Sequence, residues 1–170
     1  MVLVNSQKPL ISLEEELEML RIYLDMERLR FKNSFDYFIV CKNEINTETV
    51  LVPPLILQPF CENALLYGLM HKEKKGNLKI DLNWSDETLE CAISDDGIGR
   101  ERAAALNGKS TDKKESMGPQ ITSQRLALIN NGVDVHTFYS VEDILDEHKN
   151  ICGTKVILRI GPKLLKEELV

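Results

Sequence analysis

The sequence has few of the features that mark several large classes of protein. It contains nine glycines and six prolines in 170 residues, too few for a disordered or low-complexity chain. It lacks a basic excess: its net charge is -6, so no general attraction for nucleic acid is expected. Its most apolar stretch, residues 51–60, holds three prolines and falls well short of the roughly 20 residues that span a bilayer. Since the N-terminus does not resemble a signal peptide either, the chain is expected to be a soluble, cytosolic piece.

Cysteines are also few and are placed far apart. The four of them stand at positions 41, 61, 91 and 152, without a C-x-x-C pair and without a histidine at metal-ligand spacing. A zinc site or a disulfide framework is therefore not expected. We expect the cysteines to be small, buried, apolar residues of a protein kept in a reducing compartment.

The sequence does contain enough apolar residues, 43%, for one domain with a proper core. A helix is predicted over residues 12–30, because Ser12-Leu13-Glu14-Glu15 forms a capping box in which each side chain accepts a hydrogen bond from the other residue's backbone N–H. Leucines at positions 13, 17, 20 and 24 form one apolar stripe along it. This stripe needs a partner surface, which is either the rest of the domain or a second chain.

The next part of the chain alternates between strand and helix patterns. Residues 35–41 have the alternation of a strand with one buried face. A second helix is predicted over residues 55–69, where Pro59 favours a later or irregular start. Two alternating runs at 78–82 and 89–93, joined by a turn at 84–87, predict an antiparallel hairpin.

The last third of the sequence predicts a helix and two strands. The helix covers residues 120–130, and the strands lie near 133–137 and 155–160 with the acidic residues 142–147 in a loop between them. Since most of the predicted strands are joined by hairpins, the elements indicate an α+β layered domain and do not favour a parallel, doubly wound one.

The stretch Ser94-Asp95-Asp96-Gly97-Ile98-Gly99-Arg100 follows the second strand of the hairpin. Continued alternation aims Asp95 at the buried face, where an unpaired carboxylate is costly. An Asp-Gly pair after a strand also suits a tight turn, and this stretch alone leaves both interpretations open. A binding loop is favoured because residues 100–106 have a helical composition, and because Gly97 and Gly99 suit a backbone that approaches another group closely.

Three further places carry residues that suit a binding site, although each also has a plain structural interpretation. Glu62 and Asn63 lie side by side on the second helix, which also suits a solvated edge. Gly118 stands at the head of the third helix, where free N–H groups attract an anion, as at any helix start. Gly153 and Thr154 open the last strand, which also suits a simple turn.

Taken in order, five blocks of the sequence resemble the ATP-binding domain of LytS-like sensor histidine kinases, in the superfamily that includes DNA gyrase and MutL. The blocks are ISLEEELEMLRIYLDMERLRF, VPPLILQPFCENALLYGL, SDDGIGRERAAAL, SMGPQITSQRLALIN and GTKVILRI. The resemblance implies the Bergerat ATP-binding fold, a two-layer α/β sandwich in which helices cover one face of a mixed, mostly antiparallel sheet. It also divides the chain into a helix at 1–34 that leads from an upstream dimerisation and phosphoacceptor segment, a catalytic domain at 35–162, and a tail at 163–170.

The resemblance implies ATP and Mg²⁺ as cofactors. Asp95 would accept a hydrogen bond from the adenine amino group, with Thr154 beside it. Gly97 and Gly99 would let the backbone pass under the nucleotide. Asn63 would coordinate the magnesium ion that bridges the phosphates.

Two more roles follow from the same resemblance. Gly118 and the helix start after it would receive the phosphates, with residues 101–117 as a lid. Glu62 would be the carboxylate that assists a histidine nucleophile.

The implied function is that of the catalytic domain of a two-component sensor histidine kinase, which transfers the γ-phosphate of ATP to a histidine outside this sequence. The three histidines here all lie away from the first helix, at positions 71, 136 and 148. The implied partners are a response regulator and a second copy, joined through the upstream segment. The implied location is the cytoplasmic side of a bacterial inner or plasma membrane, reached only through upstream segments.

The sequence departs from the family pattern at three places. Leu66-Tyr67 stand where a basic residue and a histidine are usual, Asp96 stands where asparagine is usual, and Pro119-Gln120 replace an apolar pair. Leu66 and Tyr67 keep open a degenerate module that binds nucleotide without phosphotransfer. A hydrolytic ATPase of the same superfamily is disfavoured, because its general-base glutamate would fall on Pro59.

Overall fold

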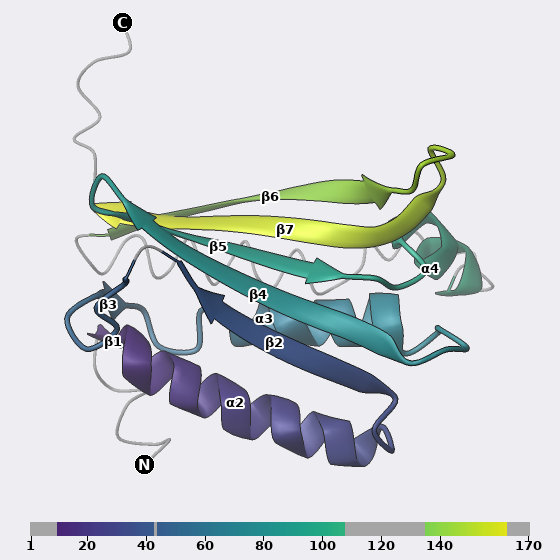
Figure 1. Ribbon diagram of the computed structural model, residues 1–170, viewed down its shortest axis with the longest axis horizontal. Coiled ribbons are helices and arrows are strands. Elements are labelled where there is room, and N and C mark those ends of the chain that lie inside the picture. Colours follow the sequence, from purple (N-terminus) through teal and green to yellow (C-terminus); the bar gives the residue numbers. More distant parts are fainter. Residues whose placement is uncertain (1–9, 43, 108–134, 163–170) are drawn as a thin grey trace, which may run out of the picture.

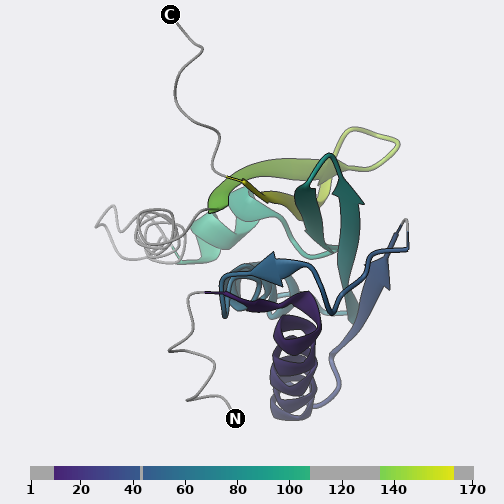
Figure 2. The same cartoon turned by 90° about the vertical axis from the view of Figure 1, so that its left-hand side faces the viewer.

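In the computed structural model, helices pack against one face of a five-stranded sheet (Figures 1 and 2). The structure describes residues 10–42, 44–107 and 135–162. The strands are β2 (Phe35–Cys41), β4 (Gly76–Ser85), β5 (Thr88–Asp95), β6 (Val135–Leu145) and β7 (Ile151–Pro162). They lie in the order β2-β4-β5-β7-β6, and every neighbouring pair is antiparallel except β2 and β4. The predicted α+β sandwich with a mixed, mostly antiparallel sheet is confirmed.

The first helix, α2 (Leu13–Arg30), begins where the capping box predicts. The Glu15 N–H donates to Ser12 Oγ at 3.2 Å, and the Ser12 N–H donates to Glu15 Oε2 at 3.0 Å. All four leucines of the stripe are buried, and they share one core with the inner faces of β4 and β5. The partner surface of this stripe is therefore the domain itself, and the second chain that the sequence left open is not needed to cover it.

A buried acid ties α2 to the chain that leads into the second helix. Glu16 is 1% exposed, and its carboxylate accepts hydrogen bonds from the backbone N–H of Leu55 at 2.8 Å and of Leu57 at 3.0 Å. A short antiparallel ladder between β1 (Ile11–Ser12) and β3 (Leu51–Val52) joins the same two segments. The N-terminal helix is thus held at its first turn by both side-chain and backbone hydrogen bonds.

The second helix starts later than the predicted residue 55. Helix α3 covers Gln58–Asn63 with Pro59 in its first turn, and it continues without a break as the π-helix η1 (Ala64–Leu69). The delay has a backbone cause, since Leu55 has a φ of 58°, which no α-helix accommodates. The late start that Pro59 favours is therefore observed, with the irregular backbone at Leu55 lying before α3. The π-helix has no signal in the sequence.

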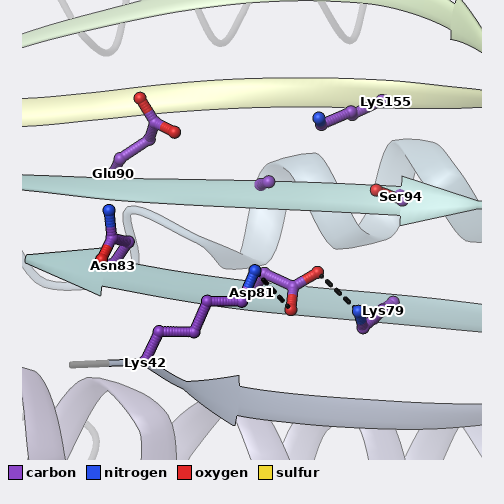
Figure 3. A pocket seen from close by; sticks show the side chains of 8 residues that line it. Lys42, Lys79, Asp81, Asn83, Glu90, Ser94 and Lys155 are labelled. Atoms are coloured by element: carbon purple, nitrogen blue, oxygen red, sulfur yellow. Dashed lines mark ion pairs between the residues drawn. The ribbon is translucent and has the colours of Figure 1, made fainter. Parts of the chain in front are cut away.

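The β4–β5 hairpin is formed as predicted and defines the two faces of the sheet. Its two-residue turn, Asp86-Glu87, has positive φ at both positions, as a type I′ turn requires. Along both strands buried and more exposed residues alternate, so every second side chain points at the helices. The intervening residues form an open, polar outer face with a hollow of about 430 Å³. Figure 3 shows Asp81 on this face between Lys42 and Lys79, which pair with it at 3.6 and 3.1 Å.

Two expectations about the last third of the chain are wrong. The acidic residues predicted to lie in a loop at 142–147 belong to strand β6 as far as Leu145, because the strand continues to pair with β7 there. Strand β7 also begins before residue 155, at Ile151. The predicted helix at 120–130 lies outside the described residues.

The expectation about the cysteines holds for two of the four. Cys61 and Cys91 are buried in the core, and burial raises the pKa of both thiols above the ordinary value. Cys41 is exposed and Cys152 is partly exposed, while all four are free thiols. Within the described ranges, no helix has both the length and the apolar character needed to cross a membrane.

Candidate functional site

The Asp95 carboxylate ends strand β5 on its buried face, as the alternation predicts. Asp95 is 4% exposed, and its neighbours in the sheet are Leu78 on β4 and Thr154 on β7. The Gly97 N–H donates to Asp95 Oδ1 at 2.9 Å. A bend at Gly97 and then helix α4 (Arg100–Asn107) follow, so the hairpin-turn interpretation of this stretch is wrong: it is a loop between a strand and a helix.

Burial raises the pKa of the Asp95 carboxyl from 3.8 to about 6. A hydrogen bond from the Gly97 backbone opposes this rise, the charge of Asp96 adds to it, and the Thr154 backbone and the charge of Lys72 oppose it. Asp95 is therefore a carboxylate that gives up most of its hydration and receives little in return from the protein. A ligand that donates a hydrogen bond to it would supply part of what burial removes.

Gly97 and Gly68 press the loop after β5 against the π-helix η1. A methyl group added at Gly97 would overlap the backbone of Gly68, and one added at Gly68 would overlap the Asp95 carboxylate. The Ile98 N–H also donates to the Gly68 carbonyl at 3.3 Å. The close approach expected of Gly97 is present, and within the protein its partner is Gly68.

Gly99 turns the chain into helix α4. It has a φ of 82°, a region that side chains disfavour, and an added methyl group would overlap Ile151 of β7. Immediately after it, the Arg100 guanidinium makes a bidentate ion pair with Asp143 of β6, at 2.9 and 3.0 Å. Asp143 is also the sheet neighbour of Thr154. This pair has no signal in the sequence, where the acidic residues 142–147 predict a loop.

Thr154 lies directly beside Asp95 in the sheet, where the resemblance placed it. The two residues are register partners of β5 and β7, and a methyl group at the preceding Gly153 would overlap the Asp95 carbonyl oxygen. Gly153 and Thr154 lie inside β7, so the turn interpretation of these two residues is wrong.

Asn63 and Glu62 lie at the end of α3, directly before η1. Asn63 is partly buried and Glu62 is exposed. Burial, then the charge of Glu27 and then that of Glu62 raise the pKa of the Tyr23 hydroxyl on α2 above its ordinary range. Since successive helical residues point about 100° apart, Glu62 and Asn63 do not share one direction. Asn63 stands five residues before Gly68, or about 7 Å along the helical segment that contacts Asp95.

The remaining predicted site residues cannot be placed. Gly118 and most of the predicted lid at 101–117 lie outside the described residues. Within the described ranges, no group of three or more histidine, cysteine, aspartate or glutamate side chains is arranged to hold a metal ion.

The sequence is similar to sensor proteins over nearly its full length, although no family model matches it. It is 27% identical to the sensor protein LytS of Bacillus cereus over 170 residues, which cover 99% of this chain and 28% of that protein. It is 24% identical to LytS of Staphylococcus epidermidis over 93% of this chain and 26% of that protein. The chain thus spans little more than a quarter of the length of these curated relatives.

The fold is similar to solved structures of histidine kinase domains. The catalytic domain of histidine kinase ThkA superposes with a TM-score of 0.59 over 90% of this chain and 95% of that domain, at 12% identity. The fold is that of a histidine kinase catalytic domain. A mycobacterial sensor histidine kinase, MprB, superposes with a TM-score of 0.58 over 92% of this chain and 98% of its own, at 15% identity. In sequence and in fold the chain is therefore similar to the catalytic, ATP-binding domain of sensor histidine kinases.

Proposed function

We propose that this chain is the catalytic, ATP-binding part of a sensor histidine kinase and transfers the γ-phosphate of ATP to a histidine elsewhere in its parent protein. The observation that carries the proposal is the buried carboxylate of Asp95 at the end of β5. The similarity to LytS and to the fold of ThkA supports the kinase class. A solved structure of the full-length protein ShkA, which is similar in fold, contains the ATP analogue AMPPNP.

The residues around Asp95 fit a purine base. Among the described residues, Asp95 receives hydrogen bonds only from the backbones of Gly97 and Thr154, and a carboxylate has room for more donors. The exocyclic amino group of adenine is a donor that would complete this set. Recognition through a hydrogen-bonding group discriminates strongly, because a base without that donor would leave the carboxylate buried and unpaired.

The other site residues keep the roles that the resemblance implies, as proposals. Asn63 would hold Mg²⁺ through its side-chain oxygen, a ligand type that this hard cation prefers. That ion would neutralise charge on the phosphates, and Gly118 would receive them at a helix start. Glu62, which is exposed, would accept the proton of the attacking histidine. Gly97 and Gly99 would let the backbone pass under the nucleotide.

We extend the same proposal to the parent protein. It would work in two-component signal transduction as a homodimer at a bacterial membrane, reached through segments outside this sequence. Its downstream partner would be a response regulator. ThkA, one of the structures similar in fold, has been solved in complex with the response regulator TrrA.

A thermal shift experiment tests the nucleotide site. Saturating Mg-ADP is expected to raise the melting temperature of the 170-residue chain by several degrees, because a ligand that binds only the folded state adds about 2.7 kcal/mol at a hundredfold excess over Kd. Asp95→Asn should abolish the shift, since an amide cannot replace both acceptor oxygens. Asp81→Asn, on the outer face of the sheet, is the matched control and should retain it.

An unchanged melting temperature of the wild-type chain would contradict the proposal. If the shift is present, a histidine-bearing helical segment of a LytS relative, supplied in trans with labelled ATP, separates the kinase from a binding module. Label on histidine supports the kinase. Binding without transfer would leave a nucleotide-binding module in its place.

A further inference from the structure

Asp96, the neighbour of Asp95, is held by donors from two separate segments. The Asn77 N–H donates to its Oδ1 at 2.7 Å and the Asn77 side-chain amide donates to its Oδ2 at 2.8 Å. The Lys72 ammonium lies 3.0 Å from Oδ1. The Asp96 N–H in turn donates to the Asn77 carbonyl at 3.3 Å. Asp96 therefore joins the end of β5 to the start of β4 and to the chain that follows η1.

The donors around Asp96 favour an acid over an asparagine at this position. Three donors converge on the two oxygens of Asp96, whereas an asparagine would offer one oxygen and would turn its own N–H groups toward Lys72 or Asn77. Partial burial opposes ionisation, but the hydrogen bonds from Asn77 and Lys72 outweigh it and hold the pKa of the Asp96 carboxyl below its usual value. The aspartate that departs from the family pattern is thus matched by its own neighbours.

These contacts affect Asp95, because Asp96 follows it directly in the chain and Lys72 follows the helix η1 that contacts its carboxylate. Lys72 lies three residues after the end of η1, and its N–H donates to the Leu69 carbonyl at 3.1 Å. Within η1, Gly68 lies against the Asp95 carboxylate. A shift of Asp96 would therefore move the backbone of Asp95 relative to η1, which contacts the Asp95 carboxylate.

We propose that Asp96, bound by Lys72 and Asn77, is a positioning residue that fixes the Asp95 carboxylate in the orientation that receives the nucleotide base. The proposal rests on the nucleotide site proposed above. Lys72 has a second role in it, since its ammonium contacts Asp96 and its charge also acts on Asp95.

A positioning role through charge leaves a signature that a merely structural contact does not. Among the described residues, the charged groups that act on Asp95 are Asp96, which raises its pKa, and Lys72, which lowers it. Substitutions at either residue leave the backbone donors at Gly97 and Thr154 chemically unchanged, so they remove a charge without removing one of these donors. Removing Asp96 or Lys72 should thus shift the pH at which Asp95 ionises in opposite directions.

The experiment is calorimetric binding of Mg-ADP to the 170-residue chain between pH 5 and 8. Asp96→Asn should weaken binding at pH 8 about tenfold, because the variant loses one of the hydrogen bonds that the charged Asp96 carboxylate accepts and holds Asp95 less firmly. It should also move the midpoint of the binding-versus-pH curve to lower pH. Lys72→Met should move that midpoint to higher pH, while Lys72→Arg should leave it unchanged. Titration of the nucleotide's phosphates is common to all variants and cancels in the comparison.

Lys42→Met and Asp81→Asn are controls of the same charge change on the outer face of the sheet, and neither should move the midpoint. Failure of the wild-type chain to bind Mg-ADP would refute the proposed function. If the wild type binds Mg-ADP and both Lys72→Met and Asp96→Asn keep the wild-type midpoint, the positioning role is refuted while the proposed function stands. If Asp96→Asn is unfolded by circular dichroism, the two Lys72 variants decide, because the Lys72 side chain is partly exposed and its loss does not open the core.

Discussion

At the scale of single residues, Asp95 is a site where stability and binding oppose each other. Its pKa is about 6 in the folded domain against 3.8 when unperturbed, so the folded state holds this proton more tightly than the unfolded state does. The stabilisation from that proton is complete below about pH 4 and is lost as the pH rises through about 6. At neutral pH the ionised carboxylate is therefore a cost to the domain without ligand.

Asp95→Asn should consequently stabilise the ligand-free domain at pH 7.5. The gain is at most about 3 kcal/mol, because one pKa unit corresponds to about 1.4 kcal/mol and the amide gives up part of the hydrogen bonding. Urea unfolding of both proteins at pH 4.5 and pH 7.5 measures it. The gain should be smaller at the lower pH, and a variant that is less stable than the wild type at pH 7.5 would contradict the account.

At the scale of elements, Glu16 fixes α2 against the start of α3. Glu16→Ala should cost about 3 kcal/mol, since it leaves the amides of Leu55 and Leu57 without their acceptor. The stability of Glu16→Gln should lie between those of the wild type and Glu16→Ala, because one amide oxygen replaces two carboxylate oxygens. The midpoints of urea unfolding measure this series, provided that the m-value is the same for all variants. Glu18→Ala, at an exposed position on the same helix, is the control and should change the free energy of unfolding little. Equal midpoints for the Glu16 and Glu18 variants would refute the tie.

The elements also show which parts of the fold a sequence can predict. The capping box at Ser12 and the alternation along β4 and β5 are local patterns, so the helix start and the hairpin follow from them. The parallel pairing of β2 with β4 and the π-helix after Asn63 depend on contacts between distant residues, which no local pattern records. The acidic residues at the end of β6 predict a loop when the sequence is considered alone. The contacts that keep them in a strand, which are the pairing with β7 and the ion pair of Asp143 with Arg100, involve residues distant in the sequence.

The candidate site divides in the same way. Alternation was sufficient to aim Asp95 inward, and the resemblance placed Thr154 beside it. Gly68, Lys72 and Asn77 had no signal of their own, because their importance comes from lying next to Asp95 and Asp96 after folding.

At the scale of the whole molecule, α2 and the sheet form one core, so the domain should unfold as a unit. The leucines of α2 pack in the same cluster as the inner residues of β4, β5 and β7. Trp84, the one tryptophan of the sequence, lies near the β4–β5 turn and reports on the sheet. Its fluorescence and the helical circular dichroism signal should give coincident urea transitions. A separate, earlier loss of helix would instead mark residues 1–34 as a unit of their own.

The contact between Gly68 and Gly97 has a consequence for how this sequence can change over generations. Gly97 leaves room for the backbone of Gly68, and Gly68 leaves room for the Asp95 carboxylate. A side chain at Gly97 needs η1 and the loop after β5 to separate, and a side chain at Gly68 needs the Asp95 carboxylate to move. Mutational drift therefore has no single-step path through either glycine that leaves the surroundings of Asp95 unchanged.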